Sequence, residues 1–237
     1  MKNLAKLTAI LFLLISTTSC LFDGVQGNGN VVNKKRKISN DFVRIKVNKG
    51  LHVFITRDSK PSLVVEADEN LHELITTEVE NGTLTISTTK NIGMASAKNI
   101  HLSVENLNEI LVSSGAEVST ENKLVTEKLR VDASSGAEVK LQLKVRDLTC
   151  DTSSGAMVRF QGKAVDLVLS SSSGSNINAI ELNSKNCEAQ ASSGSGIKVN
   201  VSDHFEGRAS SGAHIKYSGN PKTVKRNKSS GGSVSSS

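Results

Sequence analysis

The chain has 237 residues, and its 29 lysines and arginines outnumber its 23 aspartates and glutamates, which gives a net charge of +6. It contains no tryptophan, one tyrosine and six phenylalanines. Because few aromatic side chains are available to stack on bases and the positive charge is mild, the composition argues against nucleic acid as a partner. The length is sufficient for one elongated domain with a thin aliphatic core.

Residues 1–19 have the pattern of a signal peptide. Two lysines precede a short apolar run from Leu7 to Ile15, which is too short to span a bilayer as a helix. Cys20 follows at the position of a bacterial lipoprotein cysteine, although Thr17 stands where leucine is usual. We expect an exported, outer-membrane-anchored lipoprotein that is held by acyl chains on Cys20 and faces either the cell surface or the periplasm. A general signal peptide followed by a chance cysteine is the alternative.

Residues 20–30 are expected to form the lipidated N-terminus and a tether, because they contain three glycines and no apolar pattern. Residues 31–105 show strand patterns without a strict repeat, which predicts irregular β coils that also cap the solenoid described below. Asn81-Gly82 is a strong turn signal. Residues 68–78 are expected to hold a short helical turn capped by Asp68 or Asn70.

Residues 106–221 repeat a Ser-Ser-Gly phrase at intervals of 18 to 21 residues. Four copies continue with alanine and the others with serine or glycine. A fixed interval of this size is typical of a solenoid, in which each repeat forms one coil stacked on the last. The repeated glycines are Gly115, Gly136, Gly155, Gly174, Gly194 and Gly212, and a partial repeat around Gly231 lies in a basic, Ser/Gly-rich C-terminal tail at 222–237.

Small or apolar residues recur five and three positions before each glycine and three positions after it, and from the second repeat on also seven positions before it. The residues between them are mostly polar, so the flanks alternate with the period of a strand that has one buried and one exposed face. Antiparallel hairpins are the rival arrangement, but they would not keep these positions in phase. The pattern predicts an all-β, single-domain parallel β-helix with coils of about 19 residues, stacked about 4.8 Å apart.

Each repeated glycine is expected to form a sharp corner with a positive φ, which glycine adopts without the steric cost of a Cβ. The two serines are expected to hydrogen-bond backbone groups at the corner and to stack as hydroxyl ladders. A phosphate-binding loop or a serine nucleophile would occur once, whereas this phrase occurs at every corner.

Cys150 and Cys187 belong to repeats that lie two coils apart. Stacked coils would separate them by about 9.6 Å along the axis, further than the roughly 7 Å between Cα atoms that a disulfide tolerates. The register therefore predicts two buried free thiols, although an oxidising compartment favours disulfides.

One outward position, four residues after each glycine, is often basic. We interpret it as a broken binding stripe suited to an anionic glycan or lipid headgroups, with a solvated polar face as the alternative. The stripe residues are Lys140, Arg159, Lys198 and Lys216, and Ser119 and Asn178 occupy the same position in the remaining repeats.

A second outward position, four residues before the glycine, places Asp132 and Asp151 on adjacent coils. Such a pair could hold Ca²⁺ or act as acid and base, and a solvated face is again the alternative. The five histidines have no metal-ligand spacing, and no Ser-His-Asp or Cys-His arrangement is present. We therefore expect no cofactor, no metal and no catalytic residue.

Several motifs together resemble one bacterial family. They are the Ser-Gly-Ala repeats and the segments at 27–32, 42–45, 65–71, 81–86 and 217–221. The chain is similar to the putative auto-transporter adhesin head GIN domain family of Bacteroidetes envelopes over nearly its whole mature length. The resemblance implies a β-helical fold and an envelope location, and it brings no catalytic residue. Ser175 and Ser195 stand where alanine is usual, and Gly232 ends the series.

These observations favour a non-enzymatic, lipid-anchored envelope protein whose solenoid surface binds another molecule, as an adhesin does. The partners would be the membrane, through the anchor, and a glycan or an envelope or host surface protein. A polysaccharide-acting enzyme that uses Asp132 and Asp151, and a passive structural lipoprotein, are the alternatives.

Overall fold

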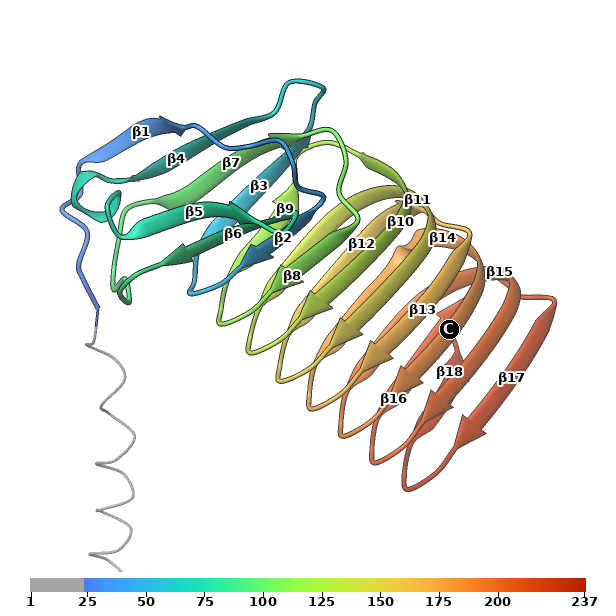
Figure 1. The fold of residues 1–237 in the computed structure, drawn as a ribbon. Coiled ribbons are helices and arrows are strands. Elements are labelled where there is room, and N and C mark those ends of the chain that lie inside the picture. The colour runs from blue at the N-terminus through green and yellow to red at the C-terminus, as the bar shows by residue number, and fades with distance from the viewer. Residues whose placement is uncertain (1–23) are drawn as a thin grey trace, which may run out of the picture.

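A computed structural model describes residues 24–237, so the predicted signal peptide and Cys20 lie outside the described residues. The chain forms a solenoid in which two long sheets face each other and the coils follow one another away from a more complex N-terminal end (Figure 1). This confirms the predicted all-β parallel β-helix. Among residues 24–237, no helix has the length and apolar character needed to cross a membrane.

Sheet 1 contains the strands that lead into each corner, and its pairs are parallel except for β5 with β6. In the order of pairing, its strands are β5 (Ile75–Glu80), β6 (Thr83–Thr88), β2 (Arg44–Val47), β8 (Glu109–Val112), β10 (Leu124–Ala133), β11 (Glu138–Thr152), β13 (Asp166–Ser171), β14 (Asn176–Ala191), β15 (Gly196–Ala209) and β17 (Thr223–Lys228).

Sheet 2 contains the strands that leave each corner, and it is parallel except at its N-terminal end, where β4 is antiparallel to both neighbours. The long strands β11, β14 and β15 bend and contribute to both sheets. In the order of pairing, sheet 2 contains β1 (Val31–Arg36), β4 (Ser62–Asp68), β7 (Lys98–Val104), β3 (His52–Arg57), β9 (Glu117–Thr120), β11, β12 (Met157–Lys163), β14, β15, β16 (His214–Ser218) and β18 (Ser233–Ser236).

The core is built from the repeated inward positions, as predicted. Residues five positions before successive glycines pair directly with one another, for example Val131 with Cys150 and Cys150 with Leu169. The positions seven and three before the glycine and three after it are likewise buried in every coil from Val131 to Ile215. Each inward column is therefore a ladder of small or apolar side chains between the two sheets.

Each corner is a four-residue turn in which both central residues have positive φ. In the corner at 153–156, φ is 51° at Ser154 and 73° at Gly155. The amide of Ala156 donates to the carbonyl oxygen of Ser153 at 3.1 Å. These features define a type I′ turn, which reverses the chain within two residues. The positive φ of the glycine was predicted, whereas that of the preceding serine was not.

The corners are also bonded to one another. The amide of each corner glycine donates to the carbonyl oxygen of the serine before the next glycine, as Gly136 does to Ser154 at 3.0 Å and Gly155 to Ser173 at 3.1 Å. The prediction that serine hydroxyls satisfy the backbone at the corner is wrong for the Ser-Ser-Gly-Ala corners, because backbone amides and carbonyls satisfy each other there. The second serine and the glycine of these corners are exposed.

The first corner of this series comes earlier than the repeats. Lys49 and Gly50 have φ of 58° and 67°, and the Gly50 amide donates to the Ser114 carbonyl oxygen at 3.0 Å. The coil of β2 and β3 therefore stacks directly on the coil of β8 and β9, although about 50 residues are inserted between them. The inserted residues form the N-terminal end.

The inserted segment and β1 close the N-terminal end of the core, and we call them the cap (residues 31–36 and 62–104). In the cap, β6 and β7 add one more parallel coil, and β5 and β4 then run antiparallel to them. The predicted helical turn is the 3₁₀ helix η1 (Glu69–Leu71), which follows Asp68, and neither predicted cap side chain bonds it there. Asn81 and Gly82 form the predicted turn between β5 and β6, with φ of 49° and 73°.

Asp68 instead fastens the segment that precedes β1. Its buried carboxylate accepts hydrogen bonds from the amides of Gly29 at 2.8 Å and Ala97 at 2.9 Å. These bonds, that of Ala97 first, lower the pKa of Asp68. The contribution of the carboxylate to docking is therefore full above about pH 4 and is lost as the pH falls below that value. Residues 24–30, expected to be a tether, thus lie bonded to the cap.

A buried hydroxyl cluster occupies the corner at 172–175, one of those that depart from the alanine pattern. The hydroxyl of Ser175 lies 2.9 Å from that of Ser171 and 3.0 Å from that of Thr152, and it donates to the Ser172 carbonyl oxygen at 2.6 Å. Every hydroxyl in the cluster has a partner, so these polar groups can be buried without the cost of an unsatisfied group.

The last described residues form a coil of their own. Strands β17 and β18 are joined by a further corner in which Ser230 and Gly231 have φ of 45° and 74°. Val234 is buried at the third position after the glycine, where the other repeats carry valine or isoleucine. Residues 222–237 are therefore a partial repeat whose sheet 1 strand, β17, is exposed along its whole length.

Glycine has two roles in the coils: it adopts a positive φ at the corners, and at Gly162 it allows a close approach of two backbones. Substitutions to alanine distinguish these roles. A Cβ on Gly155 would meet nothing within 4 Å, so Gly155→Ala adds only the strain of a positive φ and should lower the free energy of unfolding by about 1 kcal/mol. A Cβ on Gly162, at φ 117° in β12, would lie 2.0 Å from the Leu143 carbonyl oxygen, so Gly162→Ala should cost about 3 kcal/mol or more. Urea unfolding of both variants checks this, and equal losses would contradict it.

Cys150 and Cys187 are both buried free thiols, as the register predicted. Burial raises the pKa of each thiol well above its ordinary value. A thiol-reactive dye should therefore label neither cysteine at pH 8 in the folded chain, and both should react in urea. Rapid labelling without denaturant would show that one of the two is accessible.

Candidate functional site on two outward faces

The predicted basic stripe is a continuous row on the outer face of sheet 2. Its members are direct partners on neighbouring strands, so side chains repeat about every 4.8 Å. The row runs through Ser119, Lys140, Arg159, Asn178, Lys198 and Lys216, on β9, β11, β12, β14, β15 and β16.

The four cations of the stripe are not equivalent. Lys140 lies 3.0 Å from the Glu117 carboxylate and 2.9 Å from that of Glu138, and these two groups raise the pKa of Lys140. Among residues 24–237, Arg159, Lys198 and Lys216 form no ion pair. The row therefore has a neutralised cation near the cap and three exposed, uncompensated cations further along. The two glutamates stand two residues after their glycines, where the repeat pattern itself could have revealed them.

The same row continues into the cap through residues that the sequence analysis did not single out. Phe54 on β3 is the partner of Ser119, and His101 on β7 is the partner of Phe54. The two rings are stacked, with centroids 5.3 Å apart and planes 16° apart. The Glu66 carboxylate lies 3.3 Å from His101 Nε2 and accepts a hydrogen bond from Asn99 at 2.8 Å.

The bond from Asn99, followed by that from His101, lowers the pKa of Glu66. No local motif links Phe54 to His101, because the three strands β4, β5 and β6 lie between their strands in the sequence.

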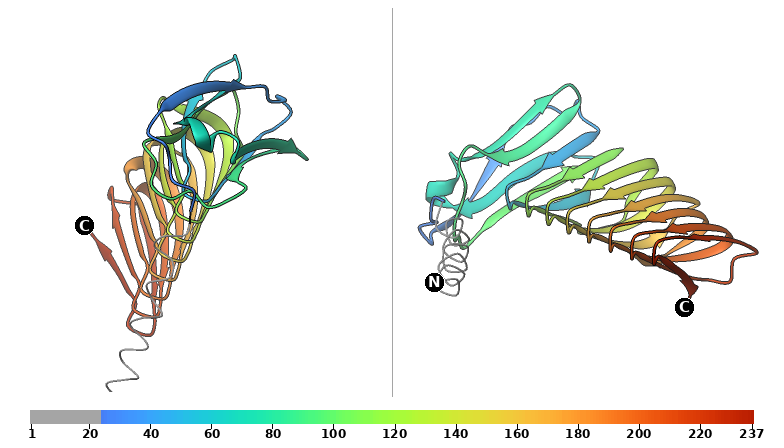
Figure 2. Two further views of the ribbon diagram at one scale, coloured as in Figure 1. Left: turned by 90° about the vertical axis from the view of Figure 1, so that its left-hand side faces the viewer. Right: turned by 90° about the horizontal axis from the view of Figure 1, so that it is seen from below.

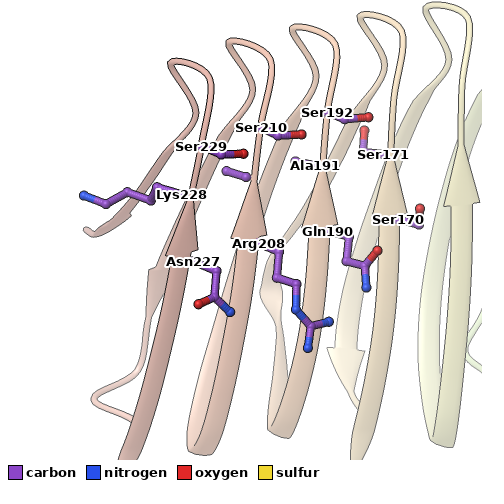
Figure 3. Close-up of a pocket in the computed structure, with 11 residues that line it drawn as sticks. Ser170, Ser171, Gln190, Ala191, Ser192, Arg208, Ser210, Asn227, Lys228 and Ser229 are labelled. Carbon is purple, nitrogen blue, oxygen red and sulfur yellow. The ribbon is translucent and has the colours of Figure 1, made fainter.

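A groove runs across the coils on the outer face of sheet 1, next to the corners (Figure 3). One side is a row of serines and the other a row of longer polar side chains. In Figure 3 the hydroxyls of Ser192, Ser210 and Ser229 follow one another along one edge, and Gln190, Arg208 and Asn227 lie along the other. The Glu206 carboxylate binds Arg208 and lies 3.2 Å from Lys225 Nζ, so the charge of this groove is partly compensated.

Asp132 and Asp151 line the continuation of this groove toward the cap and are strand partners, as the repeat predicted. Arg130 lies between them, 2.9 Å from an Asp132 carboxylate oxygen and 2.7 Å from an Asp151 oxygen. These carboxylates, Asp132 first, raise the pKa of Arg130. One cation therefore already occupies the space between the two carboxylates. Residues 24–237 contain no cluster of three or more His, Cys, Asp or Glu side chains placed to hold a metal ion.

Comparison with known proteins now identifies the fold family. Residues 41–221 match the family described as "Putative auto-transporter adhesin, head GIN domain". The chain belongs to this family. The match extends from the first coil to the end of the regular repeats, so it includes both outward faces. No curated protein matches the chain.

Solved structures of similar proteins share the whole architecture. A putative adhesin from Bacteroides fragilis is 23% identical, with a TM-score of 0.83 over 90% of this chain and 100% of its own. A putative adhesin from Parabacteroides merdae is 20% identical, with a TM-score of 0.76 over 91% and 99%. A protein from Parabacteroides distasonis titled putative lipid binding protein is 19% identical, with a TM-score of 0.73 over 90% and 99%. Because these sequence identities are low, the structural similarity establishes the shared fold and does not assign a ligand.

Removing the cation between the two aspartates tests the role of Arg130. In Arg130→Gln two neighbouring carboxylates repel each other, but all three groups are partly exposed, so the loss of stability at pH 7 should be below about 1 kcal/mol. The loss should shrink at high salt, because ions screen the repulsion between the two carboxylates. Urea midpoints at low and at high salt measure this. A loss that is larger at high salt would contradict the arrangement.

Proposed function

We propose that this protein is a non-catalytic, lipid-anchored adhesin-like protein of the cell envelope that holds a ligand against the outer face of its solenoid. The observation that carries the proposal is the row of three exposed, uncompensated cations on sheet 2. A rigid β ladder keeps these charges at fixed spacing, and cations left without partners in the folded chain are available to an anionic ligand. Membership of a family named for adhesion supports a binding role.

The ion pairing of the two aspartates on sheet 1 supports a non-catalytic role. The stacked carboxylates Asp132 and Asp151, the strongest catalytic candidates in the sequence, share Arg130 as their counter-ion. Arg130 lies between the two carboxylates, in the space that a metal ion or a reacting group would need.

The proposed anchor also orients the molecule. Val25 is bonded to Asn91 and Gly93 of the cap, and it follows Cys20 by five residues. Five residues span at most about 18 Å. If Cys20 carries the acyl chains, the cap stands near the membrane and the coils lead away from it, with the C-terminal coil at the far end (Figure 2). The cations at 198 and 216 would then face the surroundings of the cell.

Protease treatment of intact cells tests the proposed location. The protein should be digested while a soluble periplasmic protein survives, and Cys20→Ser should move the protein from the membrane fraction to the soluble fraction. Survival of the protein on intact cells would contradict a surface-binding role, and membrane retention of Cys20→Ser would contradict the lipid anchor. Turnover of a glycan that is lost in Asp132→Ala would contradict the non-catalytic role.

A further inference from the structure

The outer row of sheet 2 combines two kinds of binding surface on one straight line. At the cap end it presents the stacked rings of His101 and Phe54, and at the other end it presents three cations. Six strand-to-strand steps separate Phe54 from Lys216, which corresponds to a length of about 29 Å. The row lies on the face of the sheet, so its backbone groups are already paired with neighbouring strands.

Phe54 differs in exposure from the other phenylalanine and tyrosine side chains among residues 24–237. Those side chains belong to the core, and they are Phe42, Phe160, Phe205 and Tyr217. Phe54 and His101 are only partly buried. Glu66, which accepts a hydrogen bond from Asn99, contacts the edge of the histidine ring, so the stack is held before any ligand arrives.

The cationic end has a regular charge spacing. Lys198 and Lys216 stand on adjacent strands, about 4.8 Å apart, and Arg159 stands two strands from Lys198, about 9.6 Å away. Asn178 fills the step between Arg159 and Lys198 and offers an amide instead of a charge. A shallow groove runs beside these residues and is lined by Met157, Asn176 and His214 among others.

From this row we infer the class of ligand: a linear polysaccharide that carries carboxylate or sulfate groups. This inference rests on the proposed function and specifies its ligand. The face of Phe54 that is turned away from His101, toward Ser119, can pack on the apolar C–H face of a sugar ring, and amides bond its hydroxyls. Arginine and lysine bind its anionic groups. A polymer that repeats in one direction matches contacts that repeat in one direction.

An acidic polypeptide fits this face less well. Extended peptides bind sheets mainly by adding a strand to a free edge, where unpaired N–H and C=O groups are available. The row lies on the face of sheet 2, away from its edges, so recognition there depends on side chains alone. An aromatic stack in line with spaced cations and the amide of Asn178 matches the alternating apolar and polar surfaces of a sugar chain.

Binding of polygalacturonate and dextran sulfate to the purified full chain in mild detergent tests the inference, with neutral dextran and polyglutamate as comparisons. The variant Arg159→Gln/Lys198→Gln/Lys216→Gln removes the free cations. The matched control Lys60→Gln/Lys123→Gln/Lys128→Gln removes the same charge from exposed residues outside the row. Phe54→Leu keeps an apolar side chain but removes the ring face.

We expect at least one acidic polysaccharide to bind, with an affinity that falls as salt rises. The row variant should weaken binding by about tenfold or more, the control by less than about twofold, and Phe54→Leu by about threefold to tenfold. Near-UV circular dichroism of each variant should match that of the parent chain, which separates lost contacts from lost folding.

Three results would overturn the inference. The first is the absence of binding to both acidic polysaccharides, and the second is an equal loss in the row variant and its control. The third is equal binding of polyglutamate without an effect of Phe54→Leu, which would assign the row to an acidic polypeptide. If the chain still binds intact envelopes or neutral dextran in any of these cases, the proposed binding function survives and only its ligand class fails. If the chain binds none of these materials, both the proposed binding function and the inferred ligand class are contradicted.

Discussion

The hydrogen bond from each corner glycine to the next corner is the interaction on which the rest of this structure depends. A type I′ turn reverses the chain within two residues, but by itself it does not fix the stacking of one coil on another. The bond from the Gly136 amide to the Ser154 carbonyl oxygen, and its equivalents from Gly50 to Gly212, continue the β ladder through the turn. Coils of slightly different length therefore stay in register, and the variation in length is taken up on the side away from the corners.

Because the register is fixed, equivalent side chains of successive coils line up in rows. The residues in these rows determine which charges and polar groups each outer face presents. A single exposed lysine contributes little free energy to binding an anion, because its charge is screened and its side chain is mobile. Lys198 and Lys216, held on neighbouring strands, place charge at a spacing that a polymer can match. The same register explains which rows are neutralised, since Glu117 and Glu138 reach Lys140, and Arg130 reaches two aspartates. Function in this family is therefore expected to vary with the residues in the rows, while the fold stays constant.

The repeats could be predicted from the sequence because each one restates the same local pattern. The inward positions around Gly155 and its equivalents gave the core, the coil length and the two buried thiols. The positive φ of the serines and the bonds between corners were missed, because serine rarely adopts this conformation alone and only the stacked neighbours make it favourable. The antiparallel strands of the cap and the pairing of Phe54 with His101 and Ser119 were also missed, because contacts across 47 or 65 residues leave no periodic signal. Asp68 resembled a helix cap in sequence, yet its carboxylate binds two amides that are distant in the chain.

Hydrogen exchange at the corner glycines tests this account most directly. Gly115, Gly136, Gly155, Gly174, Gly194 and Gly212 lie on the exposed edge of the molecule, where amides without partners exchange within seconds or less, yet each donates to the next corner. Resolved by NMR, these six amides should be strongly protected, and that of Gly231, which has no acceptor among the described residues, should exchange rapidly. Rapid exchange at the interior corners would contradict the account, because the coils would then be held in register by their side chains alone.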